Sequence, residues 1–329
     1  MTLTPSAVWD ELDWRRSRLK TEPILNGYLS RGLLSVIAKS RKEEKYIAYG
    51  GFDRDKNQSV EKAVSEMVER MAWFACLHTL ASHGTSISTF STVGWAAHTS
   101  LEQAISSSRG EFLERCFFEV LLARLLHNPV SHSVCACTRL MNSSEFEGVP
   151  CESVNFGLEI EVRVPREDIY LTYVLLCCAL DRKDTGRFGV TFGMGHSENR
   201  RKAVDTARIE AFLVTSAVRK LVNAEPSERQ RKSLSKAEAD YFKNLYLDKD
   251  VLANVTHYAS IAARQKMRKC RLCTWKTPEP SITLDLTSTL PDFLRDVKRF
   301  VCYTCRRDSH QVTALTNSLG GMPPIILNW

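Results

Sequence analysis

Two segments of the sequence carry the same arrangement, Glu-x-x-Glu-Arg, within runs that are otherwise apolar. The residues are Glu66, Glu69 and Arg70 in the first segment, and Glu111, Glu114 and Arg115 in the second. Residues three apart on a helix share one face, so each pair of carboxylates can point at one place. Converging carboxylates repel each other unless a cation lies between them, and Mg²⁺ takes oxygen ligands and bridges to phosphates. The adjacent arginine can bind a carboxylate or a phosphate oxygen.

The simplest alternative is a surface ion pair between Glu66 and Arg70, which are four residues apart on a helix. Two copies weaken that alternative, because "MVERMAWFACL" and "FLERCFFEVLLARLL" both predict buried surroundings, where a charge needs a partner or an ion. A third segment carries Glu210 among apolar neighbours. We therefore expect three helices to bring carboxylates to a multi-metal phosphate site.

The elements around these residues predict an α/β fold. Ala63, Met67, Met71 and Phe74 recur at helical spacing, and a second long helix follows a cap at Thr99 or Ser100. The strand-like segments are not in strict alternation with the helices, which excludes a doubly wound sheet. We expect a single domain with a mixed β-sheet and long helices over residues 45–329, preceded by a lead-in over residues 1–44.

Composition and charge narrow the class of protein. The net charge of +7, from 45 Lys and Arg against 38 Asp and Glu, favours an anionic partner such as a nucleotide. The charges are scattered and form no stripe for nucleic acid, so we expect no nucleic-acid partner. The opening residues are polar and lack a secretory signal, and the apolar run 169–180 predicts a buried strand too short for a bilayer. We expect a cytoplasmic protein with reduced cysteines and no membrane partner.

Three motifs in order along the chain resemble the YcaO superfamily of ATP-dependent peptide-modifying enzymes. The first is "GGFDRDKNQSVEKAVSEMVER", a glycine turn followed by a helix that ends in Glu-x-x-Glu-Arg. The second is "STVGWAAHTSLEQAISSSRGEFLER", which adds a glycine-alanine turn before the same ending. The third is "GMGHSENRRKAVDTARIE", a glycine-rich turn followed by Ala-x-x-x-Ala-x-x-Glu. Together the motifs cover residues from about 50 to 222.

The resemblance implies an ATP site unlike a P-loop, and the sequence has no G-x-x-x-x-G-K-[ST]. It further implies that ATP phosphorylates a peptide amide oxygen after a nucleophile has attacked the amide carbon. It assigns the metal ligands and the nucleotide contacts but no catalytic residue. The metal ligands would be Glu66, Glu69, Glu111, Glu114 and Glu210, with Arg70 and Arg115 near phosphate or anchoring carboxylates, and with Glu66 and Glu210 also at the nucleotide.

The product and the partners follow from the same resemblance. We expect cyclodehydration of Cys, Ser or Thr in a ribosomally synthesised precursor peptide to thiazoline or oxazoline. Azoline-forming members often end in spaced prolines, whereas Pro323 and Pro324 are adjacent here, so thioamide formation with a sulfur donor is the alternative. A non-catalytic subunit that binds a peptide or a partner protein is a third interpretation. We expect a separate leader-peptide-binding partner, because the chain has no length left for a fused one; a homodimer is compatible with the sequence.

Two further groups of residues have a chemical and a simpler interpretation. Two CxxC pairs, Cys270 with Cys273 and Cys302 with Cys305, have the spacing of a structural zinc site. However, "RFVCYTCRR" predicts a strand whose two cysteines point to opposite faces, which favours buried packing cysteines. His196, in the glycine-rich turn, is the histidine to test, against the simpler interpretation of an ordinary loop histidine.

Overall fold

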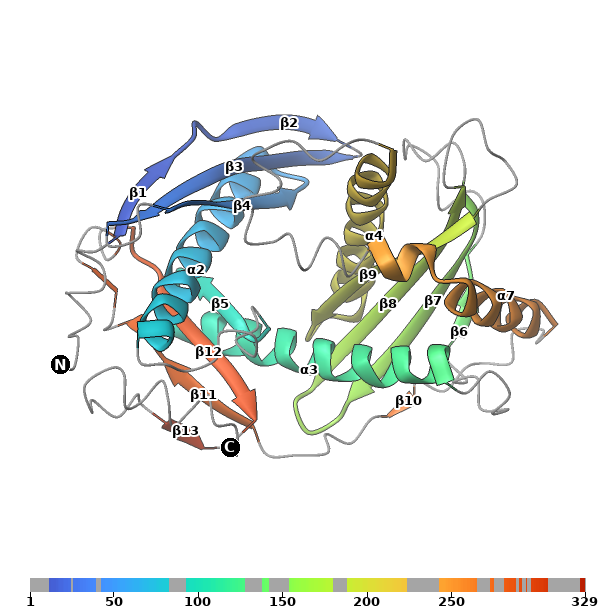
Figure 1. Cartoon of the computed structure of the whole chain (residues 1–329). Helices are drawn as coiled ribbons and strands as arrows, with labels where there is room; N and C mark the ends of the chain where they lie inside the picture. Colours follow the sequence, from blue (N-terminus) through green and yellow to red (C-terminus); the bar gives the residue numbers. More distant parts are fainter. Residues whose placement is uncertain are drawn as a thin grey trace. The chain divides into compact units, whose positions relative to one another are not determined.

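The computed structural model divides into two compact units, and the chain first passes from one to the other within a helix, between Leu113 and Glu114. Figure 1 labels the helices and strands along the chain. The described residues are 12–24, 26–39, 43–82, 93–127, 138–141, 154–179, 188–223, 243–264, 273–274, 281–287, 290–291, 294, 297–306 and 326–328.

The first unit begins with an antiparallel sheet of four strands. They are β1 (Leu12–Arg16), β2 (Lys20–Ile24), β3 (Gly27–Ala38) and β4 (Glu43–Asp53). β3 is long enough for β1 and β2 to pair with its two ends along one edge, while β4 pairs along its other edge. The far edge of β4 therefore has backbone N–H groups that need acceptors from outside the sheet.

Helix α2 (Lys56–Ser82) packs on β3 and β4. The helix starts where Asp55 caps it: the Gln58 backbone N–H donates to Asp55 Oδ1 at 2.9 Å. The close approach of helix and strand requires a glycine at position 51. A Cβ there would lie 2.5 Å from the Ser59 carbonyl oxygen and 2.4 Å from the Ala63 nitrogen.

A second sheet of the first unit covers the other side of α2. Its strand order is β13 (Ile326–Asn328), β11 (Ser281–Asp285), β12 (Phe300–Arg306) and β5 (Trp95–His98). α2 contacts β5 and β12 as well as the first sheet, so one hydrophobic core fills both sides of the helix. Trp95 and Tyr303 stack within this core at 4.8 Å between ring centroids.

The second unit is built on one sheet with the strand order β10-β7-β8-β9, and β6 also pairs with β7. The strands are β6 (Thr138–Leu140), β7 (Val154–Val164), β8 (Ile169–Ala179), β9 (Phe188–Ser197) and β10 (Cys273–Thr274). β8 is almost wholly buried, as its apolar run predicts. β10 runs parallel to β7 and the other pairs are antiparallel, so the sheet is mixed, as predicted.

Among the described residues, the long helices of the second unit are the second half of α3 (Leu101–His127), α4 (Arg200–Asn223) and α7 (Lys249–Arg264). α3 lies over the sheet face that carries Tyr173 and Phe192, which contact the rings of Phe117 and Phe118. α4 packs on the opposite face of β8 and β9. α7 contacts β6, β7 and β9.

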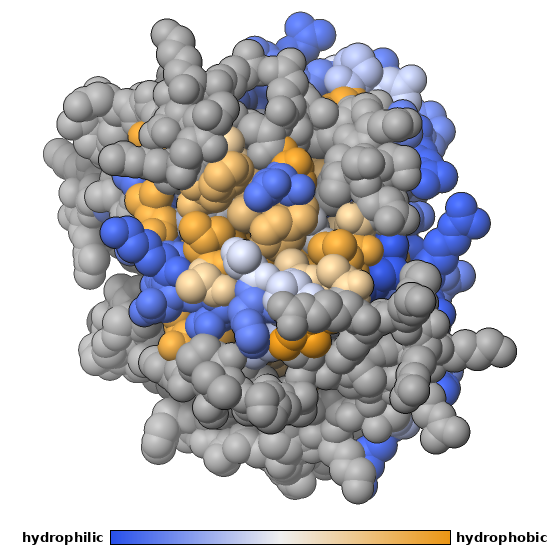
Figure 2. All heavy atoms as spheres, turned by 90° about the vertical axis from the view of Figure 1, so that its right-hand side faces the viewer, coloured by the Kyte–Doolittle hydropathy of each residue, from blue (hydrophilic) through white to orange (hydrophobic). Residues whose placement is uncertain are grey.

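The surface on the side of α7 has an apolar centre. Among the atoms drawn in colour, Figure 2 shows hydrophobic side chains gathered in the middle of this face, with hydrophilic ones around them. Among the described residues, Leu247 is the large hydrophobic side chain that is exposed, at 43%. No helix in the described part of the chain combines the length and the apolar character needed to cross a bilayer.

The mixed α/β fold class is confirmed, but the domain organisation differs from the expected one. We predicted one domain after a lead-in over residues 1–44, whereas the chain divides into two compact units. A boundary after residue 44 would fall inside β4, and residues 12–38 form strands of the same sheet. The polar residues of this segment predict a lead-in. In the structure they belong to strands at one edge of the small sheet, where side chains are exposed and can be polar.

The packing of α2 on β4 predicts a contrast between two adjacent glycines. Gly51→Ala places a Cβ against backbone atoms at 2.4 and 2.5 Å, whereas the nearest atom to a Cβ at Gly50 is the Ser30 carbonyl oxygen at 3.0 Å. Because overpacking against backbone is costly, we expect Gly51→Ala to lower the free energy of unfolding by about 1–3 kcal/mol. Gly50→Ala is the matched control and should cost less in urea unfolding. Equal losses for the two variants would contradict the close approach of α2.

Candidate functional site

The first Glu-x-x-Glu-Arg copy is anchored to the edge of β4. Glu66 Oε2 accepts a hydrogen bond from the Gly50 backbone N–H at 3.2 Å, and Glu66 Oε1 accepts one from the Arg70 guanidinium at 3.3 Å. The side chains of Glu66 and Arg70 are 33% and 22% exposed. The ion pair between Glu66 and Arg70 that the simpler interpretation predicts is therefore present. It is half-buried, and the Glu66 carboxylate also accepts the hydrogen bond from the sheet. Glu69, on the same helix, is also half-buried.

The second copy places a buried carboxylate in the second unit. Glu114 is 4% exposed, and its Oε2 lies 2.9 Å from His196 Nδ1. Arg115 Nε lies 3.8 Å from Glu114 Oε1. The Tyr173 hydroxyl donates to the Glu114 backbone carbonyl at 2.7 Å. Burial, followed by the nearby Glu114 carboxylate, raises the pKa of the Tyr173 hydroxyl well above its ordinary value, so Tyr173 remains a donor.

Glu210 reaches the same strand from the opposite helix. Its Oε2 accepts a hydrogen bond from the Met194 backbone N–H at 2.8 Å, and the Arg115 guanidinium lies 3.6 Å from Met194 Sδ. Glu114, Arg115 and Glu210 therefore all contact residues 194–196 of β9. In the second unit the structure brings together three of the predicted site residues, and it adds His196 to them.

The two units hold Glu66 and Glu210 in the same way. In each unit the carboxylate lies on a helix that follows an edge strand and accepts the N–H of a strand residue 16 positions earlier, Gly50 in one case and Met194 in the other. A buried N–H at a sheet edge needs an acceptor, and a carboxylate supplies a strong one. The same geometry thus occurs in both units.

The glycines beside these contacts repeat as well. A Cβ at Gly51 would meet the carbonyl oxygen of residue 59 and the nitrogen of residue 63, and a Cβ at Gly195 would meet the oxygen of residue 203 and the nitrogen of residue 207. The offsets are the same in both units, eight (51 to 59, 195 to 203) and twelve (51 to 63, 195 to 207). Glycine allows each helix to lie directly on its strand, which brings the carboxylate within reach of the edge N–H.

Other predicted residues are not gathered with these. Glu111 is half-buried on the part of α3 that belongs to the first unit. Among the described residues, no group of three or more His, Cys, Asp or Glu side chains is placed to hold one metal ion. Convergence of all five glutamates on a multi-metal site stays a prediction, because they are divided between the two units.

Of the four cysteines in the two CxxC pairs, Cys302 and Cys305 have side chains that the structure describes. Cys302 and Cys305 are both buried on β12, and their odd spacing puts them on opposite faces, as predicted. Burial raises the pKa of the Cys302 thiol to about 12, which disfavours the thiolate that zinc requires. Cys273 belongs to β10 of the other unit, and Cys270 lies outside the described residues.

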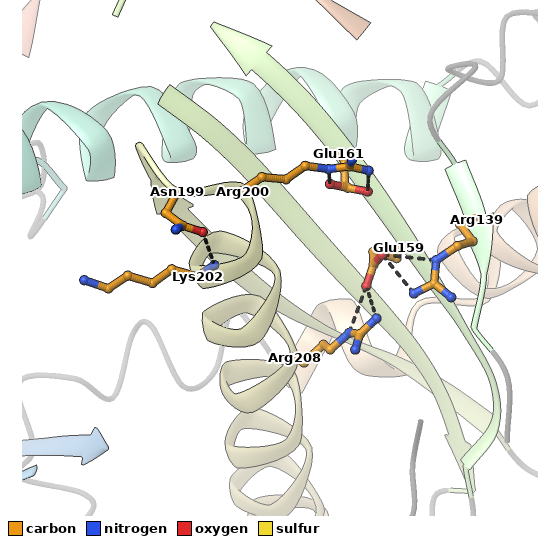
Figure 3. Close-up of polar contacts among 7 residues, drawn as sticks. All are labelled: Arg139, Glu159, Glu161, Asn199, Arg200, Lys202 and Arg208. Atoms are coloured by element: carbon orange, nitrogen blue, oxygen red, sulfur yellow. Dashed lines mark hydrogen bonds and ion pairs between the residues drawn. The ribbon is translucent and has the colours of Figure 1, made fainter. Parts of the chain in front are cut away.

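A network of ion pairs on the α4 side of the second sheet was not predicted (Figure 3). Glu159 is 2% exposed, and Arg139 of β6 and Arg208 of α4 each bind one of its carboxylate oxygens at 2.9 Å. Nearby, Glu161 binds Arg200 through both oxygens, at 2.6 and 2.8 Å. Glu159 and Glu161 are two residues apart on β7 and therefore share one face of the sheet, but no local signal in the sequence shows that α4 covers this face. The network holds α4 and β6 on β7.

Comparisons with known proteins give distant likenesses only. No family model and no curated protein matches the chain. Among solved structures it is similar to YcaO from Methanopyrus kandleri bound with AMPPCP and Mg²⁺, with 13% identity, 94% of this chain and 90% of that chain covered, and a TM-score of 0.48. It is also similar to the heterocyclase TruD, with 14% identity, 84% and 34% covered, and a TM-score of 0.32. Since both TM-scores are below 0.5, the functional argument depends on the motifs and contacts described above.

The ion-pair network predicts unequal effects for two neighbouring substitutions. Glu159→Gln leaves Arg139 and Arg208 facing a neutral amide in a buried place, so we expect a loss of about 3 kcal/mol in the free energy of unfolding. Glu161→Gln is the matched control: its partner Arg200 has a side chain that is 56% exposed, and the loss should be about 1 kcal/mol or less. Thermal and urea unfolding measure both. A control as destabilised as Glu159→Gln would contradict this division of roles.

Proposed function

We propose that the chain binds ATP with Mg²⁺ and activates backbone amides of a ribosomally synthesised precursor peptide. The observation that carries the proposal is the matching anchorage of Glu66 and Glu210 by edge-strand N–H groups. An anchored carboxylate presents its acceptor sites in a fixed direction, which a metal-binding residue requires. A protein that served only as a scaffold would not need an anchored carboxylate in two of the three motifs that resemble the YcaO superfamily.

The residues present fit Mg²⁺ bound with a nucleotide. Glutamate oxygens are the ligands that a hard cation prefers, and Glu66, Glu69, Glu111, Glu114 and Glu210 supply them. Arg70 lies beside Glu66 and Arg115 beside Glu114, and each arginine would balance phosphate charge as well as hold a carboxylate. ATP would supply the phosphoryl group that turns an amide oxygen into a leaving group. The chain's part is to position reactants and to neutralise charge.

For the product, we propose azoline formation at Cys, Ser or Thr, by analogy with the family that the motifs resemble. Thioamide formation is the second candidate, and the adjacent Pro323 and Pro324, which lie outside the described residues, favour it. The reaction would take place in the cytoplasm with a separate protein that binds the leader of the precursor. A non-catalytic subunit that binds a peptide is the alternative class.

Mass spectrometry of a co-expressed precursor separates the products. Loss of one water per modified Cys, Ser or Thr supports the azoline, whereas exchange of one oxygen for sulfur, dependent on supplied sulfide, supports the thioamide. Either result supports amide activation. An unmodified precursor in the presence of the leader-binding partner would favour the non-catalytic subunit.

Replacing Glu114 by Gln tests the use of ATP. The change removes one negative charge at nearly constant volume, and glutamine retains an acceptor for His196, so the fold should persist. We expect ATP turnover by the chain with its partner and peptide to fall by about 100-fold or more, because charge stabilisation at a metal is worth several kcal/mol. Phosphate release measures turnover and thermal unfolding checks the fold.

Glu119→Gln serves as the control, because Glu119 is an exposed residue of the same helix and should leave turnover unchanged. Unchanged turnover in Glu114→Gln would remove Glu114 from the nucleotide site.

A further inference from the structure

His196 has a defined place beside the carboxylate of Glu114. It lies near the end of β9, where it pairs with Leu171 of β8. Its side chain is 26% exposed. Its Nδ1 is 2.9 Å from Glu114 Oε2. An ionised carboxylate only accepts hydrogen bonds, so Nδ1 carries the proton and donates it to this contact. The contact therefore fixes the tautomer of a neutral His196.

The other contacts of Glu114 do not fix the direction of its carboxylate. The Tyr173 hydroxyl binds the backbone carbonyl of Glu114, which holds the helix and not the side chain. Arg115 Nε is 3.8 Å from Oε1, an ion-pair distance that is longer than a hydrogen bond. The hydrogen bond from His196 thus has the geometry to select one rotamer of a buried carboxylate, and a long side chain without such a bond samples several.

Both ends of this contact are held by rigid elements. Glu114 is on a long helix whose aromatic residues pack on the sheet, and β9 is fixed by ten neighbouring residue pairs with β8 as well as by the Glu210 contact at Met194. A hydrogen bond between two fixed elements can orient a side chain with little loss of entropy on ligand binding. Partners that orient a metal ligand in this way are known to affect metal affinity by about 10–100-fold when removed.

We propose that His196 is a positioning residue that holds the Glu114 carboxylate, through Nδ1–H, in the direction in which Glu114 binds Mg²⁺ with ATP. This inference rests on the proposed function. It gives a role to His196, which the sequence analysis named as the histidine to test and which lies in strand β9 and not in a loop. It also connects the end of β9 with a carboxylate on α3.

Two substitutions at the same position separate positioning from simple packing. In His196→Asn the side-chain amide nitrogen takes the place of Nδ1, whereas in His196→Gln it takes the place of Nε2 and the bond to Glu114 is lost or redirected. His257→Gln, at an exposed histidine of α7, controls for loss of an imidazole as such. Full-length proteins are titrated with a non-hydrolysable ATP analogue and Mg²⁺ in a calorimeter, and their thermal unfolding is recorded.

We expect the wild type, His196→Asn and His257→Gln to bind within about threefold of one another, and His196→Gln to bind about tenfold more weakly. The unfolding temperatures of the two His196 variants should agree. Equal binding by His196→Gln and the wild type would overturn the inference and leave the proposed function standing. Loss of binding in both His196 variants together with a lower unfolding temperature would show a packing role instead. A wild type that does not bind the analogue would overturn the proposed function and this inference with it.

Discussion

A carboxylate on a helix accepts a hydrogen bond from the edge of the strand beneath it, and this interaction recurs in both units. Glu66 binds the Gly50 N–H and Glu210 binds the Met194 N–H. The edge strand has an N–H that must be satisfied, and the helix has a charge that must not be left unpaired. The carboxylate accepts the hydrogen bond of the N–H, and the N–H is the partner of the charge. The position of the glutamate is therefore fixed by the sheet and does not depend on a ligand.

The close packing of helix on strand follows from this interaction. The carboxylate reaches the edge N–H only if the helix axis lies near the strand, and a side chain at Gly51, Gly193 or Gly195 would prevent that. On the α4 face, Glu159 and Glu161 then lie beneath the helix, where their arginine partners keep the charges paired. On the opposite face, α3 brings Glu114 to His196. The glycines that the sequence placed in turns thus lie within strands β4 and β9, where helix packing requires them.

The sequence predicted those parts of the fold that depend on local patterns. The apolar run of β8, the cap at Ser100, where Gln103 N–H donates to the hydroxyl at 3.2 Å, and the opposite orientation of Cys302 and Cys305 are confirmed. The division into two units and the burial of Glu159 could not be predicted, because they depend on which distant element covers a face. For the site, helical spacing gave the glutamate pairs. The partners of the carboxylates are backbone N–H groups 16 residues earlier and a histidine 82 residues away, which helical spacing does not show.

We propose that the anchored glutamates of both units bind Mg²⁺ with a nucleotide. The most direct measurement is calorimetric titration of the full-length chain with a non-hydrolysable ATP analogue, with Mg²⁺ and with a chelator, for the wild type, Glu66→Gln and Glu210→Gln. Glutamine keeps an acceptor for the strand N–H and removes the charge, so the fold is preserved while the metal ligand is weakened. The account predicts Mg²⁺-dependent binding by the wild type and weaker binding by each variant at an unchanged unfolding temperature. Binding that is independent of Mg²⁺, or that is equal in the wild type and both variants, would contradict it.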